Sequence, residues 1–127
     1  GVYCFVDKRI YVGEWQMNAM SGYGEFYWKD GKRYKGFYVN DKKEGFGIYY
    51  WCDPSRIYIG FWKNGRQDGL GKYLSSKHSK WGKWIGGERA AWYYSKEEAF
   101  QDNNIDLLSY KEFFSMDLNQ GMEYIMS

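Results

Sequence analysis

The sequence predicts an all-β repeat fold: an elongated, twisted, single-layer antiparallel sheet of consecutive β-hairpins, with a short α-helical C-terminal tail. Three observations lead to this prediction. The 127 residues are enough for one domain of ordinary size. Aromatic side chains make up 23% of them, and aromatic residues favour strands. An aromatic-x-Gly-x-aromatic motif also recurs at nearly constant spacing, which is typical of a repeat architecture.

The repeat boundaries follow from this motif. It begins at Tyr11, Tyr34 and Tyr58 and, in degenerate form, at Lys80, so successive copies are 23, 24 and 22 residues apart. A Gly-x-Gly step follows in the first three copies, at 22–24, 45–47 and 69–71. The chain therefore divides into a partial repeat 1–10, repeats 11–33, 34–57 and 58–79, a degenerate repeat 80–94 and a tail 95–127. Because residues 1–10 match only the second half of a repeat, we expect a longer parent protein.

Each repeat is predicted to be one hairpin. Aromatic residues and glycines alternate with polar residues at a period of two, which is the period of a strand. Polar segments at 18–21, 40–43 and 64–67 are predicted as turns within the hairpins, and Asp30-Gly31 as a turn between two units. Glycine weakens a strand unless a neighbouring group needs the space, so we expect aromatic rings to cover these glycines.

The tail differs from the repeats in charge and in periodicity. Residues 1–94 carry 16 Lys and Arg against 9 Asp and Glu, a net charge of +7, whereas residues 95–127 have a net charge of −5. Ser95 and Glu98 have the spacing of a capping box, which predicts a helix to about Asp102. A second helix is predicted from about Ser109 to Leu118. We expect the helices to dock on the basic sheet and to cover its open end.

The repeat resembles the MORN (membrane occupation and recognition nexus) repeats, whose pattern is an aromatic residue, any residue, Gly, an acidic residue and an aromatic residue, followed by Gly-x-Gly. Tyr11-Val12-Gly13-Glu14-Trp15 with 22–24 fits fully, whereas Phe37 and Phe61 replace the acidic residue in the next two copies. The resemblance covers residues 1–94. It implies a twisted sheet of hairpins with an open groove along one face, and it implies no enzyme activity.

A groove of aromatic side chains is the first candidate site. A single-layer sheet must cover its apolar face, and rigid aromatic residues carry much of the energy of protein interfaces. We therefore expect a protein partner, as a helical or extended segment, to lie in a groove lined by Tyr11, Trp15, Tyr34, Tyr38, Tyr58, Trp62 and Trp84. We also expect the tail to cover part of this groove and to compete with the partner.

Clustered basic side chains support an alternative function, targeting to phosphoinositides or another anionic membrane surface. The candidate residues are Lys32, Arg33, Lys35, Lys42 and Lys43. The same segment could also serve as the targeting part of a larger enzyme. Nucleic acid is not expected as a partner, because the aromatic residues are tied to the repeat positions of the core and the pI is only about 8.4.

Other chemistry is weakly represented in the sequence. The Gly69-Leu70-Gly71 step lacks the further residues of a phosphate-binding loop, so neither a cofactor nor a catalytic residue is predicted. Glu112 is the one calcium candidate, at the end of a segment that resembles the second half of an EF-hand loop but has a poor first half. Cys4 and Cys52 are expected to be reduced, and the chain to be intracellular. A homodimer is a possible further assembly, and the sequence leaves open whether it would form end to end through the fourth repeat.

Overall fold

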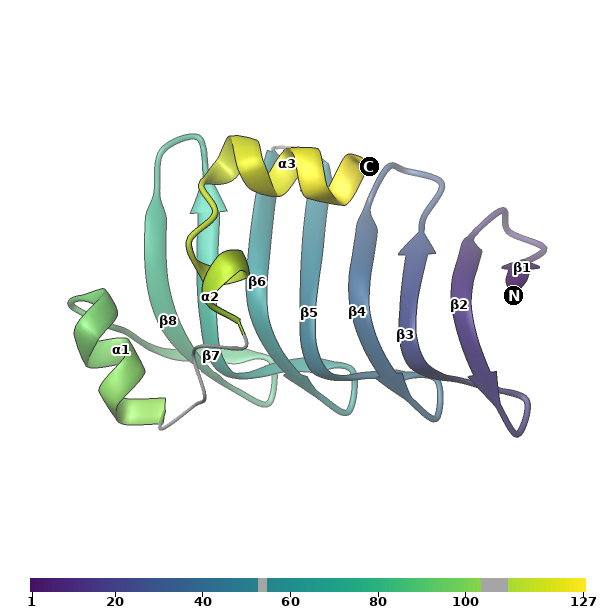
Figure 1. Cartoon of the computed structure of the whole chain (residues 1–127), viewed down its shortest axis with the longest axis horizontal. Coiled ribbons are helices and arrows are strands. Elements are labelled where there is room, and N and C mark those ends of the chain that lie inside the picture. The colour runs from purple at the N-terminus through teal and green to yellow at the C-terminus, as the bar shows by residue number, and fades with distance from the viewer. Residues whose placement is uncertain (53–54, 104–109) are drawn as a thin grey trace.

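The chain forms one open antiparallel sheet with helices on one side (Figure 1). The structure is a computed structural model that describes residues 1–52, 55–103 and 110–127. Each strand pairs with the next one in sequence, so the described part of the chain is a continuous meander. The strands are β1 (Val2–Cys4), β2 (Ile10–Gln16), β3 (Ala19–Tyr27), β4 (Arg33–Val39), β5 (Lys42–Cys52), β6 (Ser55–Lys63), β7 (Arg66–Ser75), β8 (Ser79–Ile85) and β9 (Glu88–Trp92). The helices are α1 (Lys96–Asn103), α2 (Lys111–Phe114) and α3 (Leu118–Met126). The predicted fold class is confirmed.

Two-residue turns close the hairpins within the repeats. Asn40 and Asp41 join β4 to β5, and both have positive φ angles, of 48° and 69°. Such turns match the right-handed twist of the strands that they join, and Asn, Asp and Gly tolerate them best. The corresponding first turn consists of Met17 and Asn18. The turn predicted at 18–21 was therefore placed too late, because β3 already begins at Ala19.

A row of paired glycines crosses the sheet. Each glycine lies directly opposite the next across neighbouring strands, in the order Gly13, Gly24, Gly36, Gly47, Gly60, Gly71 and Gly82. A β-carbon at Gly60 would lie 2.5 Å from the Leu70 carbonyl oxygen and 2.8 Å from the Tyr58 hydroxyl. These glycines are needed because backbone and tyrosine rings fill the space of a side chain, as the sequence predicted.

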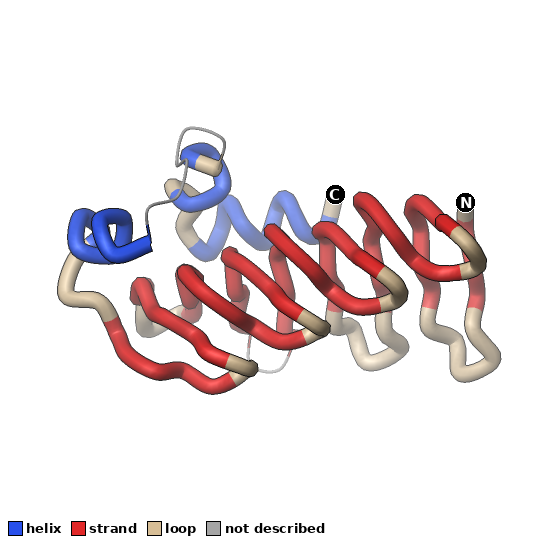
Figure 2. Tube along the Cα trace, turned by 90° about the horizontal axis from the view of Figure 1, so that it is seen from below, coloured by secondary structure: helices blue, strands red, loops and turns tan. Residues whose placement is uncertain are grey.

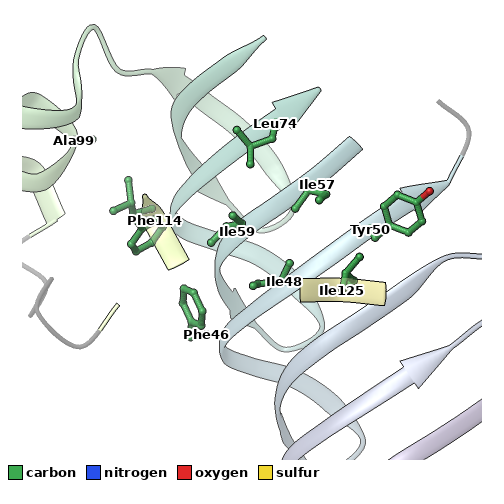
Figure 3. Packing of buried hydrophobic residues seen from close by; sticks show 10 residues of the cluster. Phe46, Ile48, Tyr50, Ile57, Ile59, Leu74, Ala99, Phe114 and Ile125 are labelled. Carbon is green, nitrogen blue, oxygen red and sulfur yellow. The ribbon is translucent and has the colours of Figure 1, made fainter. Parts of the chain in front are cut away.

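The sheet has two different faces, because side chains alternate along each strand. We call one the aromatic face; it carries the glycine row and a buried cluster that includes Tyr11, Tyr34, Tyr58 and Trp62. We call the other the tail face; its buried cluster joins Ile48, Ile57, Ile59 and Leu74 of the sheet to Phe114 and Ile125 of the helices (Figure 3). The two clusters share no buried residue, so the sheet holds two separate cores back to back.

The helices lie over the tail face rather than at the open end of the sheet. Helix α3 contacts β4, β5 and β6, α2 contacts β6, and α1 contacts β7 and β8. Figure 2 shows all three on the same side of the sheet. The expectation that they cover the open end is wrong, since the strongest apolar surface available to them is the aliphatic side of the central strands. The tail residues that the structure describes also do not cover the aromatic face, so the predicted competition in the groove loses its basis.

The first predicted helix is confirmed as α1, with a modified cap. The Glu98 amide donates to the Ser95 hydroxyl, but the Glu98 carboxylate accepts from the Tyr94 amide instead of from Ser95. The second predicted helix is two helices. Helix α2 ends at Phe114, and α3 begins after Asp117, whose carboxylate accepts from the Gln120 amide in a complete capping box. The predicted start near Ser109 lies outside the described residues.

Apolar contacts and two buried lysines, Lys35 and Lys72, hold the tail on the sheet. Phe61 packs against Tyr110 and Phe114, with ring centroids 5.3 and 6.3 Å apart. The Lys72 ammonium donates to the carbonyls of Phe114 and Met116 at 2.8 and 2.9 Å, which caps the C-terminal end of α2. The opposite net charges of sheet and tail contribute less to docking than the sequence suggested. In the described part of the chain, Lys83–Asp102 is the one ion pair between sheet and tail.

Candidate functional site: the aromatic face

The structure buries most of the predicted groove. Of the seven proposed partner-binding residues, Trp15 alone is well exposed, at 38%. The other six, Tyr11, Tyr34, Tyr38, Tyr58, Trp62 and Trp84, are at most 7% exposed. Sequence reasoning placed all seven on one face correctly but did not anticipate that they bury one another. A partner on this face would meet Trp15 and the less buried rings around it.

Edge-to-face stacking locks these rings in place. Tyr58 lies between Trp62 and Trp84, at centroid distances of 5.2 and 5.0 Å, and both contacts are T-shaped. The hydroxyl of Tyr58 donates to the Phe61 carbonyl at 2.9 Å, at the position where the register of β6 and β7 shifts. Tyr11 and Tyr34 make the same bond, to the carbonyls of Glu14 and Phe37. Burial raises the pKa of all three tyrosines, so they stay neutral donors.

A second set of rings remains accessible on the same face. Trp28, Tyr49 and Trp51 are only partly buried and form a stacked series, with centroids 5.6 Å apart for Trp28–Tyr49 and 4.6 Å apart for Tyr49–Trp51. Cations flank this series: the Arg56 guanidinium lies 5.2 Å from the Trp51 ring, and Lys32 lies 5.8 Å from Trp28. The period-two pattern of β5 could have indicated these positions, since Tyr49 and Trp51 alternate with Ile48 and Tyr50.

Lys43 occupies an aromatic cage. Its ammonium nitrogen lies 5.3–5.6 Å from the ring centroids of Trp28, Tyr34, Tyr49 and Trp62. Burial, together with the nearby charge of Lys32, lowers the pKa of Lys43 to about 8. The lysine is therefore mostly charged at neutral pH, and the π-electrons of the four rings stabilise that charge.

Four of the five residues proposed for anionic lipid have partners within the protein. Lys43 is caged, and Lys35, 5% exposed, donates to the carbonyls of Tyr124 and Ser127 at the end of α3. Arg33 donates to the Ile125 carbonyl, at 3.4 Å. Lys32 forms an ion pair with Asp30, and Lys42 is exposed beside the β4–β5 turn. The predicted basic cluster is thus divided between the two faces and the rim of the sheet.

A hollow opens on the aromatic face beside Trp15. It has a volume of about 370 Å³ and is lined by Tyr3, Phe5, Arg9, Trp15, Asn18, Met20, Phe26 and Asp41. The Asp41 carboxylate accepts from the Met20 amide at 2.7 Å, so it is fixed at the rim of the hollow. Arg9 forms an ion pair with Asp7 while its guanidinium covers Phe5.

The remaining sequence candidates are not brought together into a site. Glu112 lies exposed on α2. Asn103, at an earlier ligand position of the proposed EF-hand loop, lies inside α1 and donates its side-chain amide to the Ala99 carbonyl. The positions between them fall within 104–109, outside the described residues. Cys4 and Cys52 are free thiols, as expected.

The repeat has a counterpart among known families. The sequence model of the MORN repeat matches three times, at residues 11–33, 34–53 and 58–80, which together cover more than half of the chain. The chain belongs to the MORN repeat family. No curated protein matches it significantly. Among the residues that the structure describes, no helix is long and apolar enough to cross a membrane. MORN repeats are generally interaction or membrane-associated modules.

Membership in the MORN family makes the deviations from the repeat pattern informative. In the first repeat the acidic residue Glu14 accepts from the Tyr23 amide at 2.9 Å. In the later repeats this position faces the tail: Phe61 packs on α2, and Lys83 forms the ion pair with Asp102 of α1. Two of the residues that replace the acidic residue, Phe61 and Lys83, thus contact the tail. The degenerate fourth repeat nevertheless forms a hairpin, and Gly82 continues the glycine row.

Proposed function

We propose that this MORN-repeat chain is a non-catalytic protein-interaction module that binds a segment of a partner protein on its aromatic face, as part of a larger cytoskeletal or membrane-associated protein. The observation that carries the proposal is the accessible series Trp15, Trp28, Tyr49 and Trp51 on a face without a covering element in the described structure. Tail residues pack on the other cluster. Rigid, partly exposed aromatic side chains are the usual energetic centres of protein interfaces.

The geometry also favours an extended partner segment over a compact one. The accessible rings are spread over several strands, with Trp15 on β2, Trp28 just after β3, and Tyr49 and Trp51 on β5. Neighbouring strands are spaced by about 4.8 Å, so such a row offers a contact every few ångströms to a chain that crosses the sheet. The buried tyrosines beneath keep the rings fixed, which limits the conformational entropy lost on binding.

Peptide selection tests the proposal. The chain serves as bait for a displayed library of random peptides, and the selected peptides are measured against single variants. Trp51→Ala and Trp15→Ala are expected to weaken binding about tenfold or more, because a central aromatic residue commonly contributes over 1 kcal/mol. Val12→Ala, which removes an exposed apolar side chain from the other face, is the matched control and is expected to change the affinity less than about twofold.

Anionic lipid binding is the alternative. Lys42 lines a hollow at the turn rim together with Lys63 and Arg66, and Asp68 lies in the same hollow. Flotation with liposomes that contain phosphoinositide, at low and at physiological salt, separates the two functions. Salt-sensitive flotation that is lost in the Lys42→Glu variant would favour the membrane, whereas peptide binding that depends on Trp51 without flotation supports the protein partner.

A further inference from the structure

The internal repeat allows one site to be interpreted by comparison with the next. Phe5, Tyr11, Phe26 and Tyr38 stand one repeat before Trp28, Tyr34, Tyr49 and Trp62, the four rings of the Lys43 cage. Met20 pairs with Trp15 across β2 and β3 in the same register in which Lys43 pairs with Tyr38 across β4 and β5. Met20 therefore takes the place of the caged lysine in the first repeat.

The two occupants differ in length and in charge. A methionine side chain is one atom shorter than that of lysine and carries no ammonium group. The hollow of about 370 Å³ opens next to Met20. Its lining includes Phe5 and Phe26, which are two of the four first-repeat residues that correspond to the rings of the Lys43 cage. In the first repeat Met20 fills this position without a charge, and the Arg9 guanidinium lies 4.7 Å from the Phe5 ring and 5.8 Å from the Phe26 ring. The hollow beside these residues is open to a ligand.

The charges around the hollow favour a cation. Asp41 places a carboxylate at its rim, held by the Met20 amide, and the corresponding residue one repeat later is Gly65, which carries no charge. Arg9 lies in the hollow as well, but Asp7 neutralises it, with 2.7 Å between Nε and Oδ2. The Lys43 cage has the same neighbour, the ion pair of Asp30 with Lys32, and it nevertheless holds an ammonium group.

We propose that the hollow bounded by Tyr3, Phe5, Trp15, Phe26 and Asp41 binds the ammonium group of a lysine side chain presented by the partner protein. This inference rests on the proposed function and names the chemistry of one partner residue. The lysine stem would lie against Trp15 and Tyr3, whose rings are 5.6 Å apart, and the charge would face Asp41. Cation–π attraction and a carboxylate together select a cation over an apolar side chain of equal length.

Small probes test the inference without a partner protein. The full chain is titrated with Nα-acetyl-lysine N-methylamide and with the uncharged norleucine analogue, while the indole NMR signals are followed. The lysine probe is expected to shift the Trp15 signal and to bind about threefold or more tightly than the norleucine probe, the range of an exposed cation–π contact. Equal binding of the two probes would overturn the inference.

Four variants sharpen the test. Met20→Lys supplies the occupant of the second repeat and is expected to abolish binding of the probe while the signals of buried Trp62 and Trp84 keep their positions. Asp41→Asn keeps an acceptor for the Met20 amide but removes the charge, and it is expected to weaken binding about two- to fivefold. Glu97→Gln, an exposed charge loss on α1, is the matched control. Lys43→Met removes the ammonium group from the cage of the second repeat and is expected to create a second binding site there. The lysine probe should then also shift the indole NMR signal of Trp28.

The outcomes separate this inference from the proposed function. If Met20→Lys still binds the lysine probe at Trp15, or if Asp41→Asn binds it as tightly as the native chain does, the lysine site is refuted. Selected peptides that depend on Trp51 would then still support an interaction face without a cation site. If Met20→Lys fails to fold, the comparison of the two probes on the native chain and on Asp41→Asn decides the question.

Discussion

The glycine row shows how single residues determine this sheet. Where a strand crosses the row, the missing side chain lets a tyrosine of the same repeat lie flat over the backbone, and the tyrosine hydroxyl binds the carbonyl at the register shift. The motif in the sequence is therefore a packing unit of ring and glycine. No phosphate-binding function is needed to explain its glycines.

Gly60→Ala tests this packing unit. A β-carbon there would overlap with backbone atoms of β7, and overpacking of this kind is expected to lower the free energy of unfolding by about 3 kcal/mol. Gly65→Ala is the control: it has positive φ but open space around it, so only the strain of about 1 kcal/mol applies. Chemical denaturation of both variants measures the difference. Equal losses would show that sterics at the glycine row are not limiting.

Lys43 gives the protein a specific pH dependence. Its pKa is about 8 in the folded chain and about 10.4 when unfolded, so between these values the unfolded chain binds the extra proton. Stability therefore rises with pH in this window, by about 1–2 kcal/mol from pH 8 to 9.5. Above about pH 10 stability falls again, because burial raises the pKa of the core tyrosines and the unfolded chain ionises first.

The variant Lys43→Met isolates this contribution. It removes the rise between pH 8 and 9.5 but keeps the fall above pH 10, since the tyrosines remain. Urea denaturation of the native and variant chains at pH 7.5, 8, 9.5 and 10.5 measures both effects. If the stability of the native chain does not change between pH 8 and 9.5, the pKa of Lys43 is not lowered by the fold, which would contradict the prediction.

At the scale of elements, the tail acts as a partial second layer on one face. Helix α3 covers the middle strands, and two lysines from the sheet cap the C-terminal ends of α2 and α3. Phe61 is one of the residues at which repeat and tail meet, with ring contacts to Tyr110 and Phe114. It occupies the acidic position of the MORN pattern, so its replacement by Glu restores the family residue and places a charge against Tyr110 and Phe114.

Phe61→Glu is expected to detach α2 and to loosen α3 without unfolding the sheet. The loss of this aromatic contact is worth about 2 kcal/mol, which corresponds to roughly thirtyfold faster amide exchange in the tail. Hydrogen exchange followed by mass spectrometry gives the rates for α3 and for β5 separately. Phe37→Glu, at the same motif position but 45% exposed, should have a much smaller effect. Unchanged exchange in α3 would show that the tail docks independently of Phe61.

Parts of this element structure were readable in the sequence and parts were not. The period of two and the spacing of the motif gave the hairpins, and Ser95 with Glu98 gave α1. The break between α2 and α3 was missed, although Asp117 and Gln120 have capping-box spacing. The side on which the tail docks was also missed. The aliphatic residues alternate with the tyrosines in the same strands, and a local pattern does not show which of two apolar faces a distant helix covers.

At the scale of the whole molecule, the sheet has two apolar faces that are covered in different ways. The tail face is closed over its centre, whereas the aromatic face is filled by its own rings and keeps an accessible series of tryptophans. This division explains why the predicted groove residues are mostly buried although they share one face of the sheet.

Partner binding on the aromatic face should depend weakly on bulk salt. The accessible rings contribute through apolar burial and stacking, so raising the salt from 50 to 500 mM is expected to change the affinity of a selected peptide less than about fivefold. Isothermal titration at the two salt concentrations measures this. A loss of binding at 500 mM would assign the affinity to the basic rim around Lys42 and Lys63.

The most direct test of the account is a footprint of the bound partner. Side-chain labelling by hydroxyl radicals, read by mass spectrometry, is compared for the chain alone and with a selected peptide. The account predicts protection at Trp15, Trp28 and Trp51 and unchanged labelling at Val12, Tyr23 and Phe37 of the tail face. Protection of Tyr23 and Phe37 with unprotected tryptophans would contradict it, because the partner would then bind beside α3 and the aromatic face would serve only as a core.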